Sequence, residues 1–414
     1  MGLTLNDVCS AIVDCEHKTA PTQSEGYPSI RTPNIGRGRL ILEGVNRVSD
    51  ETYEQWTQRM QPMAGDLILA REAPIGNVAI VPSGLKVCLG QRTVLIRANR
   101  AKVLPEYLVY LMLGDEIQGR IHSQSNGATV HHLNMKDIRG LVLPQLPSVA
   151  NQRRIASILS AYDDLIENNT RRIAILEEMA RRIYEEWFVR FRFPGHEGVR
   201  MVESELGLVP EGWRMTQLDE LYRTGSGGTP SRDHPEYFGG DIKWVKTKEL
   251  DDGFLLATEE CITDVGLAKS SAKVFPRDTV LIAMYGATIG KLGILSTPAA
   301  TNQACCAVVP KDAHFSAAYA FLTLIVRRQE LIDLRAGAAQ QNINQITIRQ
   351  FQMLAPPTEV LVGFNQVVQP MLSLSERLQR KNAILRSTRD LLLPKLISGE
   401  LDVSAIPEPE ALAA

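Results

Sequence analysis

The chain has few of the features that mark several common functional classes. No stretch of about 18 consecutive apolar residues occurs, and no apolar run follows a basic N-terminal segment, so we expect neither a membrane span nor a signal peptide. The six cysteines form no C-x-x-C pair and have no histidine at metal-ligand spacing, which argues against a zinc site and favours reduced, buried thiols. These absences predict a cytoplasmic protein.

An excess of positive charge is also missing. Lysine and arginine number 45 against 47 aspartates and glutamates, for a net charge of -2. A nucleic-acid binder that works alone usually carries a strong positive balance, so any DNA contact here must depend on local basic patches or on a basic partner. With 414 residues, 44% of them hydrophobic, the chain has the size and composition of two or three globular domains.

Catalytic signatures are absent as well. An adenine methyltransferase needs an Asn/Asp-Pro-Pro-aromatic loop, whereas the one Pro-Pro pair, at 356–357, lies between alanine and threonine. Residues 286–292 have one residue too few between their glycines for a phosphate loop, and leucine occupies the position of the magnesium-binding hydroxyl. Residues 225–230 are glycine-rich without the dinucleotide fingerprint, so we interpret them as a flexible surface loop.

A hydrolytic site is a further possibility, and it would use scattered polar residues. Asp14, His17, His131 and His132 are the available set, but no nucleophile or third ligand is placed beside them. Structural or DNA-contacting roles are favoured.

The chain repeats itself at a spacing near 210 residues, which indicates a duplicated domain pair rather than a solenoid. The matched segments are, in order, 65–69 with 277–281, Ile75-Gly76 with Ile289-Gly290, Gln91 with Gln303, 93–96 with 305–309, 107–111 with 319–323, Gly127-Ala128 with Gly337-Ala338, and 141–144 with 353–356. Short apolar strands and helices alternate with turns, so each half is expected to contain an α+β globular unit.

Each half ends in a helix with the 3–4 spacing of a coiled coil. The inward positions are Ile155, Leu159, Tyr162, Ile166, Asn169, Ile173, Leu176, Ala180, Ile183 and Trp187 in the first helix, and Phe364, Val368, Met371, Ser375, Leu378, Asn382, Leu385, Arg389, Leu392 and Leu396 in the second. Every second-helix position lies 209 residues after its counterpart. Either helix alone would expose an apolar stripe, so we expect them to pair with each other.

The direction of the pair follows from chain connectivity. The second globular unit starts where the first helix stops and ends where the second helix starts, and the termini of a compact domain usually lie close together. The helices should therefore be antiparallel, with kinks near Pro370 and Pro394. Asn169 and Asn382, polar residues in the seam, are expected to set the helix register.

These residues resemble the specificity subunits of type I restriction–modification systems over essentially the whole chain. The opening Pro210-Glu211-Gly212-Trp213, the block from Gly227-Gly228-Thr229-Pro230 to Trp244-Val245, and the closing run 393–401 carry the resemblance, and residues 14–19 are similar to an alternative form of the block. The first half begins at 5–8 without the Pro-Glu-Gly-Trp opening.

The resemblance implies an α+β fold in which a long antiparallel two-helix coiled coil separates two target-recognition domains, with a pseudo-two-fold internal repeat. The expected boundaries are 1–147 for the first recognition domain, 148–193 for the central helix, 194–209 for a linker, 210–357 for the second recognition domain, 358–402 for the C-terminal helix, and 403–414 for a disordered tail.

The resemblance also implies a non-catalytic function. Each recognition domain would read half of a bipartite double-stranded DNA target, and the coil would fix the gap between the halves. Two modification subunits would bring S-adenosylmethionine and methylate an adenine in each half, and restriction subunits would use ATP and magnesium; no cofactor or metal is expected in this chain. A non-catalytic scaffold whose coil joins two ligand-binding heads is the alternative.

Base reading requires donors and acceptors that can reach groove edges, usually from polar loops. The predicted DNA contacts are His17, Lys18, Arg31, Arg37, Arg71 and Arg92 in the first domain, and Ser231, Lys243, Lys246, Lys248, Tyr285 and Asn302 in the second. For each one, a solvated charge or a structural hydrogen bond is the competing interpretation.

Overall fold

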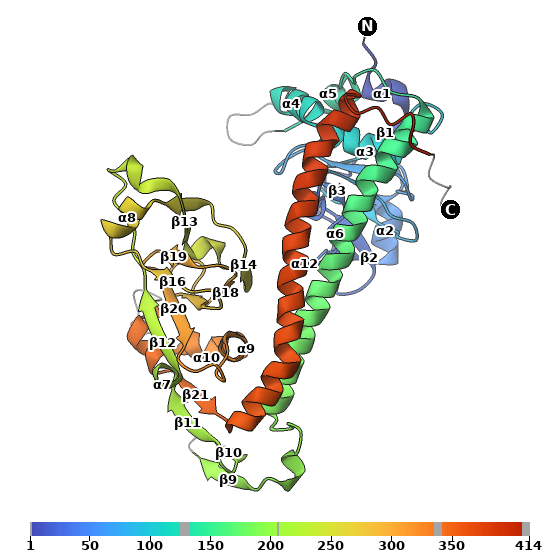
Figure 1. The fold of residues 1–414 in the computed structure, drawn as a ribbon. Helices are drawn as coiled ribbons and strands as arrows, with labels where there is room; N and C mark the ends of the chain where they lie inside the picture. Colours follow the sequence, from blue (N-terminus) through green and yellow to red (C-terminus); the bar gives the residue numbers. More distant parts are fainter. Residues whose placement is uncertain (1, 125–131, 205–206, 335–341, 408–414) are drawn as a thin grey trace. The chain divides into compact units, whose positions relative to one another are not determined.

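The computed structural model describes residues 2–124, 132–204, 207–334 and 342–407. It divides into two compact units: unit 1 comprises residues 1–166 and 384–414, and unit 2 comprises residues 167–383 (Figure 1). Two long helices, α6 (Val149–Tyr184) and α12 (Thr358–Ser398), contribute a segment to each unit. We call the part of each unit outside these helices its head.

Head 1 is built on a five-stranded sheet of order β1-β8-β5-β6-β3, beside a three-stranded sheet of order β4-β2-β7. The strands are β1 Cys9–Asp14, β2 Tyr27–Ile30, β3 Gly38–Arg39, β4 Arg47–Val48, β5 Leu67–Ala70, β6 Val78–Ile80, β7 Cys88–Leu89 and β8 Thr93–Ala98. The helices are α1 Leu5–Val8, α2 Asp50–Trp56, α3 Pro105–Leu113, α4 Asp115–Gln124 and α5 Met135–Arg139.

Head 2 repeats this plan with a five-stranded sheet of order β12-β20-β17-β18-β14 and a four-stranded sheet of order β15-β13-β19-β16. Its strands are β9 Met201–Ser204, β10 Gly207–Pro210, β11 Arg214–Gln217, β12 Tyr222–Ser226, β13 Phe238–Val245, β14 Gly253–Leu255, β15 Glu260–Ile262, β16 Val274–Phe275, β17 Val280–Ala283, β18 Leu292–Leu295, β19 Ala299–Thr301, β20 Cys305–Pro310 and β21 Gln352–Ala355. Its helices are α7 Leu218–Leu221, α8 Asp264–Ala268, α9 Ala317–Val326, α10 Arg328–Asp333 and α11 Gln345–Arg349.

The central strands explain why each head has two layers of core. All four residues of β5 and all four of β17 are buried, because both faces of a central strand are covered. Alternate residues of β5 enter different cores: Leu67 and Leu69 pack with the helices, and Ile68 and Ala70 with the second sheet. In β17, Val280 and Ile282 pack with the helices, and Leu281 and Ala283 pack with the second sheet.

This alternation corrects the repeat alignment made from sequence. Matching 65–69 with 277–281 pairs Leu67 with Thr279, whereas the ladders pair Leu67 with Ile96 and Val280 with Val308. The equivalent of Leu67 is therefore Val280, one residue further on. Hydrogen-bond register decides the match, and a shift of one residue would turn every side chain to the other face.

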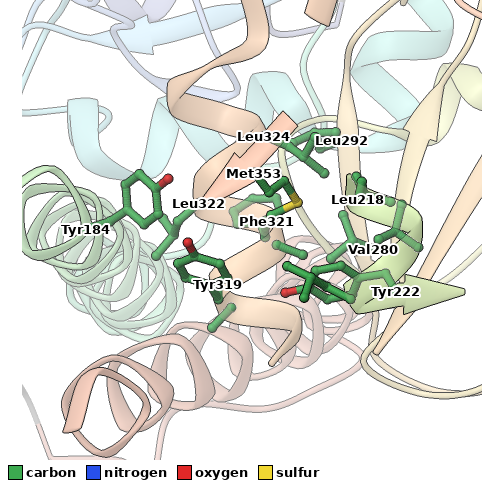
Figure 2. Close-up of a cluster of buried hydrophobic side chains, with 14 of the residues drawn as sticks. Tyr184, Leu218, Tyr222, Val280, Leu292, Tyr319, Phe321, Leu322, Leu324 and Met353 are labelled. Atoms are coloured by element: carbon green, nitrogen blue, oxygen red, sulfur yellow. The ribbon is translucent and has the colours of Figure 1, made fainter. Parts of the chain in front are cut away.

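The helix-side core of unit 2 is rich in aromatic rings. Figure 2 shows Tyr184 of α6 beside Tyr319 of α9, with Tyr222 of β12 close to the same helix. The ring centroid of Phe188 lies 4.9 Å from that of Tyr319 and 4.8 Å from that of Phe364, and both pairs pack edge to face. These rings bury the junction between head 2 and its helix segments.

Segments of α6 and α12 lie antiparallel in both units, and every predicted seam position is buried or partly buried. In unit 2, Asn169 Nδ2 donates to Asn382 Oδ1 at 2.9 Å, and Ser375 Oγ donates to Glu177 Oε1 at 2.8 Å. In unit 1, Arg389 forms an ion pair with Asp163. As residue numbers rise along α6, those of their partners fall along α12, so the predicted direction is confirmed. The two asparagines pair across the seam as expected for residues that set register.

Helix α12 runs as one helix through Pro370 and Pro394, and the kinks expected there stay a prediction. Two other details of the sequence-based picture need correction. Strands β9 and β10 form an antiparallel pair over residues 201–210, which overlap the segment 194–209 predicted as a linker. Val403 is buried in the core of unit 1, so the segment predicted to be disordered does not begin there; residues 408–414 lie outside the described residues.

Candidate nucleic-acid interface

Strand register gathers three loops at one end of the five-stranded sheet of head 1. Asp14, the last residue of β1, lies opposite Val94, and Ala70, the last residue of β5, lies opposite Thr93. The loops that follow β1 and β5 therefore meet the loop that precedes β8. We call residues 14–18, 71–77 and 90–92 loop cluster 1. It brings together four of the predicted contacts: His17, Lys18, Arg71 and Arg92.

Arg31 joins this group through the second sheet. It follows β2, whose Ile30 carbonyl accepts a 2.7 Å hydrogen bond from the amide of Gly90. Lys18 and Arg31 are both exposed, and neither has a carboxylate partner within the described ranges. Arg92 is exposed too, although its Nε lies 2.9 Å from Glu72 Oε2. Lys18 and Arg31 are thus the cations most available to a phosphate or a base edge.

Arg37 does not belong to the cluster. Its Nη2 donates to the carbonyl of Leu113 at 3.3 Å, at the end of α3, and the neighbouring Gly38 approaches Asp163 of α6. A guanidinium at the C-terminus of a helix satisfies a free carbonyl, so Arg37 caps α3, and its contact with DNA stays a prediction.

The side chain of Arg71 is hydrogen-bonded within the cluster and is largely shielded from solvent. Its Nη1 donates to both carboxylate oxygens of Asp14, at 2.8 and 2.7 Å, and its Nε donates to the carbonyl of Leu133 at 2.9 Å. Only 11% of its side chain is exposed. The sequence did not single out Arg59, which binds the same loop by donating to the carbonyl of Cys15 at 2.9 Å. No motif surrounds Arg59 that could have identified it.

Asp14, Cys15 and His17 have ligand atoms within 4.8 Å of one another, a spacing that could hold a metal ion. Both oxygens of Asp14 already accept hydrogen bonds from the Arg71 guanidinium, and a second cation there would be repelled. His131 lies outside the described residues, and the Nε2 of His132 is buried without a hydrogen-bond partner in the described part of the chain. The geometry therefore favours an ion-pair cluster over a metal or hydrolytic site.

The corresponding loops of head 2 form loop cluster 2, which we define as residues 227–231, 284–290 and 302–304. Ser226, at the end of β12, lies opposite Cys306, and Ala283, at the end of β17, lies opposite Cys305. The cluster contains Ser231, Tyr285 and Asn302 of the predicted contacts, and burial raises the pKa of Tyr285. None of the residues in cluster 2 is charged.

The three predicted lysines of head 2 are engaged within the protein. Lys243 Nζ donates to the carbonyl of Leu256 at 2.8 Å, and Lys246 Nζ lies 2.7 Å from a carboxylate oxygen of Glu260. Glu260 also forms an ion pair with Arg232. Hydrogen bonds from Arg232, and to a smaller extent from Lys246, lower the pKa of Glu260 to about 2. Lys248 pairs with Glu259. Lys243 and Lys246 are therefore held against the second sheet, whereas Lys248 is 60% exposed within its ion pair.

The glycine-rich segment of cluster 2 is packed tightly, which corrects its interpretation as a flexible surface loop. A Cβ on Gly227 would lie 1.9 Å from the carbonyl oxygen of Thr301, and one on Gly228 would lie 2.0 Å from Ser271 Oγ. The amide of Gly228 donates to the Thr301 carbonyl at 2.9 Å, and the Trp244 indole donates to the Gly228 carbonyl at 3.0 Å. Glycine is required here by close backbone approach.

Comparing the heads reveals two glutamines that were absent from the predicted contacts. Gln91 Nε2 donates to the carbonyl of His17 at 3.3 Å, and Gln303 Oε1 accepts from Thr229 Oγ1 at 2.6 Å. Each therefore ties the loop before β8 or β20 to the loop after β1 or β12. Their equivalence in the sequence repeat was the signal that could have identified them.

Comparison with known proteins agrees with this duplicated geometry. The family model "Type I restriction modification DNA specificity domain" matches residues 3–178 and 210–369. The chain belongs to this family. Each match contains one head and part of one long helix, so the type I specificity domain is the unit that is duplicated.

Individual members of the family cover most of the chain. It is 25% identical over 369 residues to the type I restriction enzyme MjaIX specificity subunit of Methanocaldococcus jannaschii, covering 88% of this chain and 84% of that one. It is 24% identical to the HindI specificity subunit of Haemophilus influenzae, covering 81% and 86%. The solved S subunit from M. genitalium shares the fold with a TM-score of 0.64 at 13% identity, covering 96% of this chain and 95% of that one.

Two other sequence-based expectations can be compared with this specificity-domain structure. All six cysteines are free thiols, and four of them are buried. Burial raises the pKa of the Cys306 thiol to about 12, so this sulfur stays protonated and unreactive at neutral pH. Among the described residues, no helix combines the length and apolar character that a membrane crossing needs.

Proposed function

We propose that this chain recognises a bipartite DNA sequence and directs the other subunits of a type I restriction–modification complex to it. Residues 1–147 and 210–357 are the two target-recognition domains, and the helices within 148–193 and 358–402 join them. Membership of the specificity-domain family and the duplication of one polar loop cluster in each head support this assignment.

The two heads use different chemistry toward DNA. In head 1, Lys18, Arg31 and Arg92 approach phosphates or guanine edges, and His17 reaches a base from the same cluster. In head 2, Ser231, Tyr285 and Asn302 read through neutral hydrogen bonds, because cluster 2 has no charged side chain. The single observation behind this proposal is that strand register gathers these loops at equivalent ends of the two five-stranded sheets.

The partners supply the catalysis. Two modification subunits bind the chain, carry S-adenosylmethionine and methylate a flipped adenine in each half-site. Restriction subunits add ATP- and magnesium-dependent translocation and cleavage. The specificity chain itself is non-catalytic, holds no cofactor or metal, and acts in the cytoplasm where the chromosome is.

The helix pair acts as the ruler that sets the gap between half-sites. Helix α6 alone has 36 residues, or about 54 Å at roughly 1.5 Å per residue. This length exceeds one turn of duplex, roughly 34–36 Å. The Asn169–Asn382 hydrogen bond supports a fixed register, because sliding the helices would leave two buried amides without partners.

The proposal is tested by co-expressing the chain with its modification subunits and sequencing the methylome. We expect methylation at one bipartite motif that disappears when this gene is deleted. Replacing residues 1–147 with the equivalent domain of another member should change one half of the motif, and inserting a heptad in both helices should widen the gap. An unchanged methylation pattern after deletion would refute the function.

A scaffold that joins two ligand-binding heads is the second candidate. The absence of charge in cluster 2 favours it, because a DNA-reading surface usually carries cations for phosphate contacts. DNA binding measured with and without the modification subunits separates the two functions. A complex that binds duplexes without any sequence preference would support the scaffold.

A further inference from the structure

The carboxylate of Asp14 is the centre of a small network in loop cluster 1. Beyond the two hydrogen bonds from Arg71, its Oδ1 accepts the amide of Cys15 at 3.0 Å, and its Oδ2 lies 2.9 Å from His17 Nε2. The side chain of Asp14 is only 19% exposed. We call Asp14, His17 and Arg71 the Asp14 clamp.

Arg71 anchors the clamp to neighbouring segments of head 1. Its backbone amide donates to the carbonyl of Arg92 at 2.9 Å, and its carbonyl accepts from the amide of Leu133 at 3.1 Å. Its Nε returns a bond to the carbonyl of Leu133. Because main chain and side chain are both fixed, Arg71 offers Asp14 a stationary partner.

His17 is the exposed member of the clamp. Its side chain is 55% exposed, while its backbone has a φ of 56°, a left-handed conformation that is uncommon for a residue other than glycine. Such a conformation persists where the surroundings enforce it, and it is frequent at binding sites. Two contacts hold His17 there: the Asp14 carboxylate on its ring, and the side-chain Nε2 of Gln91, which donates to its carbonyl.

We propose that Asp14 is a positioning residue for recognition of the first half-site, and that it acts through His17. This inference rests on the proposed function. The clamp holds the imidazole in one orientation before DNA arrives, so binding does not have to order the loop. Asp14 itself touches no base: its oxygens are already occupied by Arg71, Cys15 and His17.

Head 2 has no equivalent of the Asp14 clamp, so the half-site read by head 2 serves as an internal control. By strand register, Ser226 occupies the place of Asp14 and Met284 that of Arg71. Neither can form the ion pair. Loss of the clamp should therefore affect one half of the recognised sequence and leave the other unchanged.

The experiment uses the complex of the full chain with its modification subunits. Its readout is discrimination, the ratio of methylation kcat/KM on the intact target to that on duplexes substituted in one half-site; the swap of residues 1–147 identifies the half read by head 1. The variants are Asp14→Asn, His17→Asn and the double variant. Asparagine at 17 removes the imidazole and tolerates the left-handed backbone. Arg100→Gln is the matched control, since it removes an exposed ion pair with Glu106 beyond the opposite end of β8.

We expect Asp14→Asn to lower discrimination in the first half-site about ten-fold and to leave the second within two-fold. The double variant should show the same discrimination as His17→Asn alone, because Asp14 acts on the half-site only through His17. Arg100→Gln should show the discrimination of the unmodified protein. Equal losses in both half-sites, no loss in either, or losses that multiply in the double variant would each overturn the positioning role. An unmodified complex without any discrimination would instead overturn the proposed function.

Discussion

Loop clusters 1 and 2 occupy equivalent places in the repeat but are held by different forces. In cluster 1, the loop after β1 is fixed by charge: Arg71 grips Asp14, and Arg59 binds the neighbouring carbonyl. In cluster 2, the loop after β12 is fixed by packing, with Gly227 and Gly228 against the backbone of Thr301 and the side chain of Ser271. The same fold thus carries charged side chains in the loop cluster of one head and none in the loop cluster of the other.

This difference shows how one duplicated domain can serve two targets. The five-stranded sheets share their strand order and register, so each head has three loops at the same end of that sheet. The residues in these loops differ between the two heads. A repeat that kept the same loop chemistry would read the same bases twice, whereas these two loop clusters differ in charge and in packing.

The largest effect is expected from breaking the packing in cluster 2. Gly227→Ala would place a Cβ 1.9 Å from the Thr301 carbonyl, and the cost should be about 3 kcal/mol because backbone has to move. Chemical denaturation should show the loss in unit 2, and discrimination in the second half-site should fall with it. Gly198→Ala, where an added Cβ meets nothing within 4 Å, serves as the control. A Gly227→Ala protein as stable as the control would mean that close packing does not hold the loop after β12.

A smaller effect is expected from removing the ion pair of cluster 1. Arg71→Met introduces the residue found at the equivalent position of head 2 and leaves the Asp14 carboxylate without its main partner. Because the pair is mostly buried, we expect a loss of about 2 kcal/mol in the free energy of unfolding of unit 1. Hydrogen exchange of the amides of Cys15 and Leu133 should accelerate locally. Unchanged exchange at both would mean that the arginine does not hold the loop.

The third change compares free cations with paired ones. Arg31→Gln should weaken DNA binding of the complex several-fold and reduce the slope of log K against log salt by about 0.9, the value for one phosphate contact. Lys248→Gln should leave the slope unchanged, because Glu259 already neutralises this lysine. Binding titrations at several salt concentrations make the comparison. A reduced slope for Lys248→Gln alone would reverse the assignment.

The smallest effect is expected from Glu260, which belongs to the ion-pair network of head 2, because its side chain is 31% exposed and solvent screens its ion pairs. Its folded-state pKa of about 2 lies below the ordinary value of 4.5, so its contribution to stability is present above pH 4.5 and lost as the pH falls toward 2. Glu260→Gln should therefore unfold with less dependence on acid between pH 4.5 and 2. Urea midpoints across that range measure it, with the exposed Glu211→Gln as control.

Much of the helix pair could be predicted from sequence. The 3–4 spacing depends only on the period of the α-helix, and a stripe of apolar side chains has to be buried somewhere, so pairing and direction followed from connectivity. Each of Pro370 and Pro394 removes one amide donor, yet α12 is continuous through both, because packing in the seam supports the helix on either side. The kinks expected at these two positions stay a prediction.

The candidate site was predicted only in part. Sequence identified polar and basic residues in loops, and the structure brings His17, Lys18, Arg31, Arg71 and Arg92 together. It could not separate the exposed Lys18 from the engaged Arg71, because a hydrogen bond to the distant carbonyl of Leu133 leaves no trace in local composition. The partners of Lys246 are likewise set by the pairing of β13 with β15.

The sequence by itself determined the duplication, the two long helices and the α+β character of each half, because these depend on periodicity and on order along the chain. Tertiary structure alone decided which charges are neutralised, which glycines lie too close to a neighbour for a Cβ, and which residue of one head corresponds to which residue of the other. The physical reason is that strand register and ion pairing join residues far apart in the chain, and these contacts exist only after the sheets have formed.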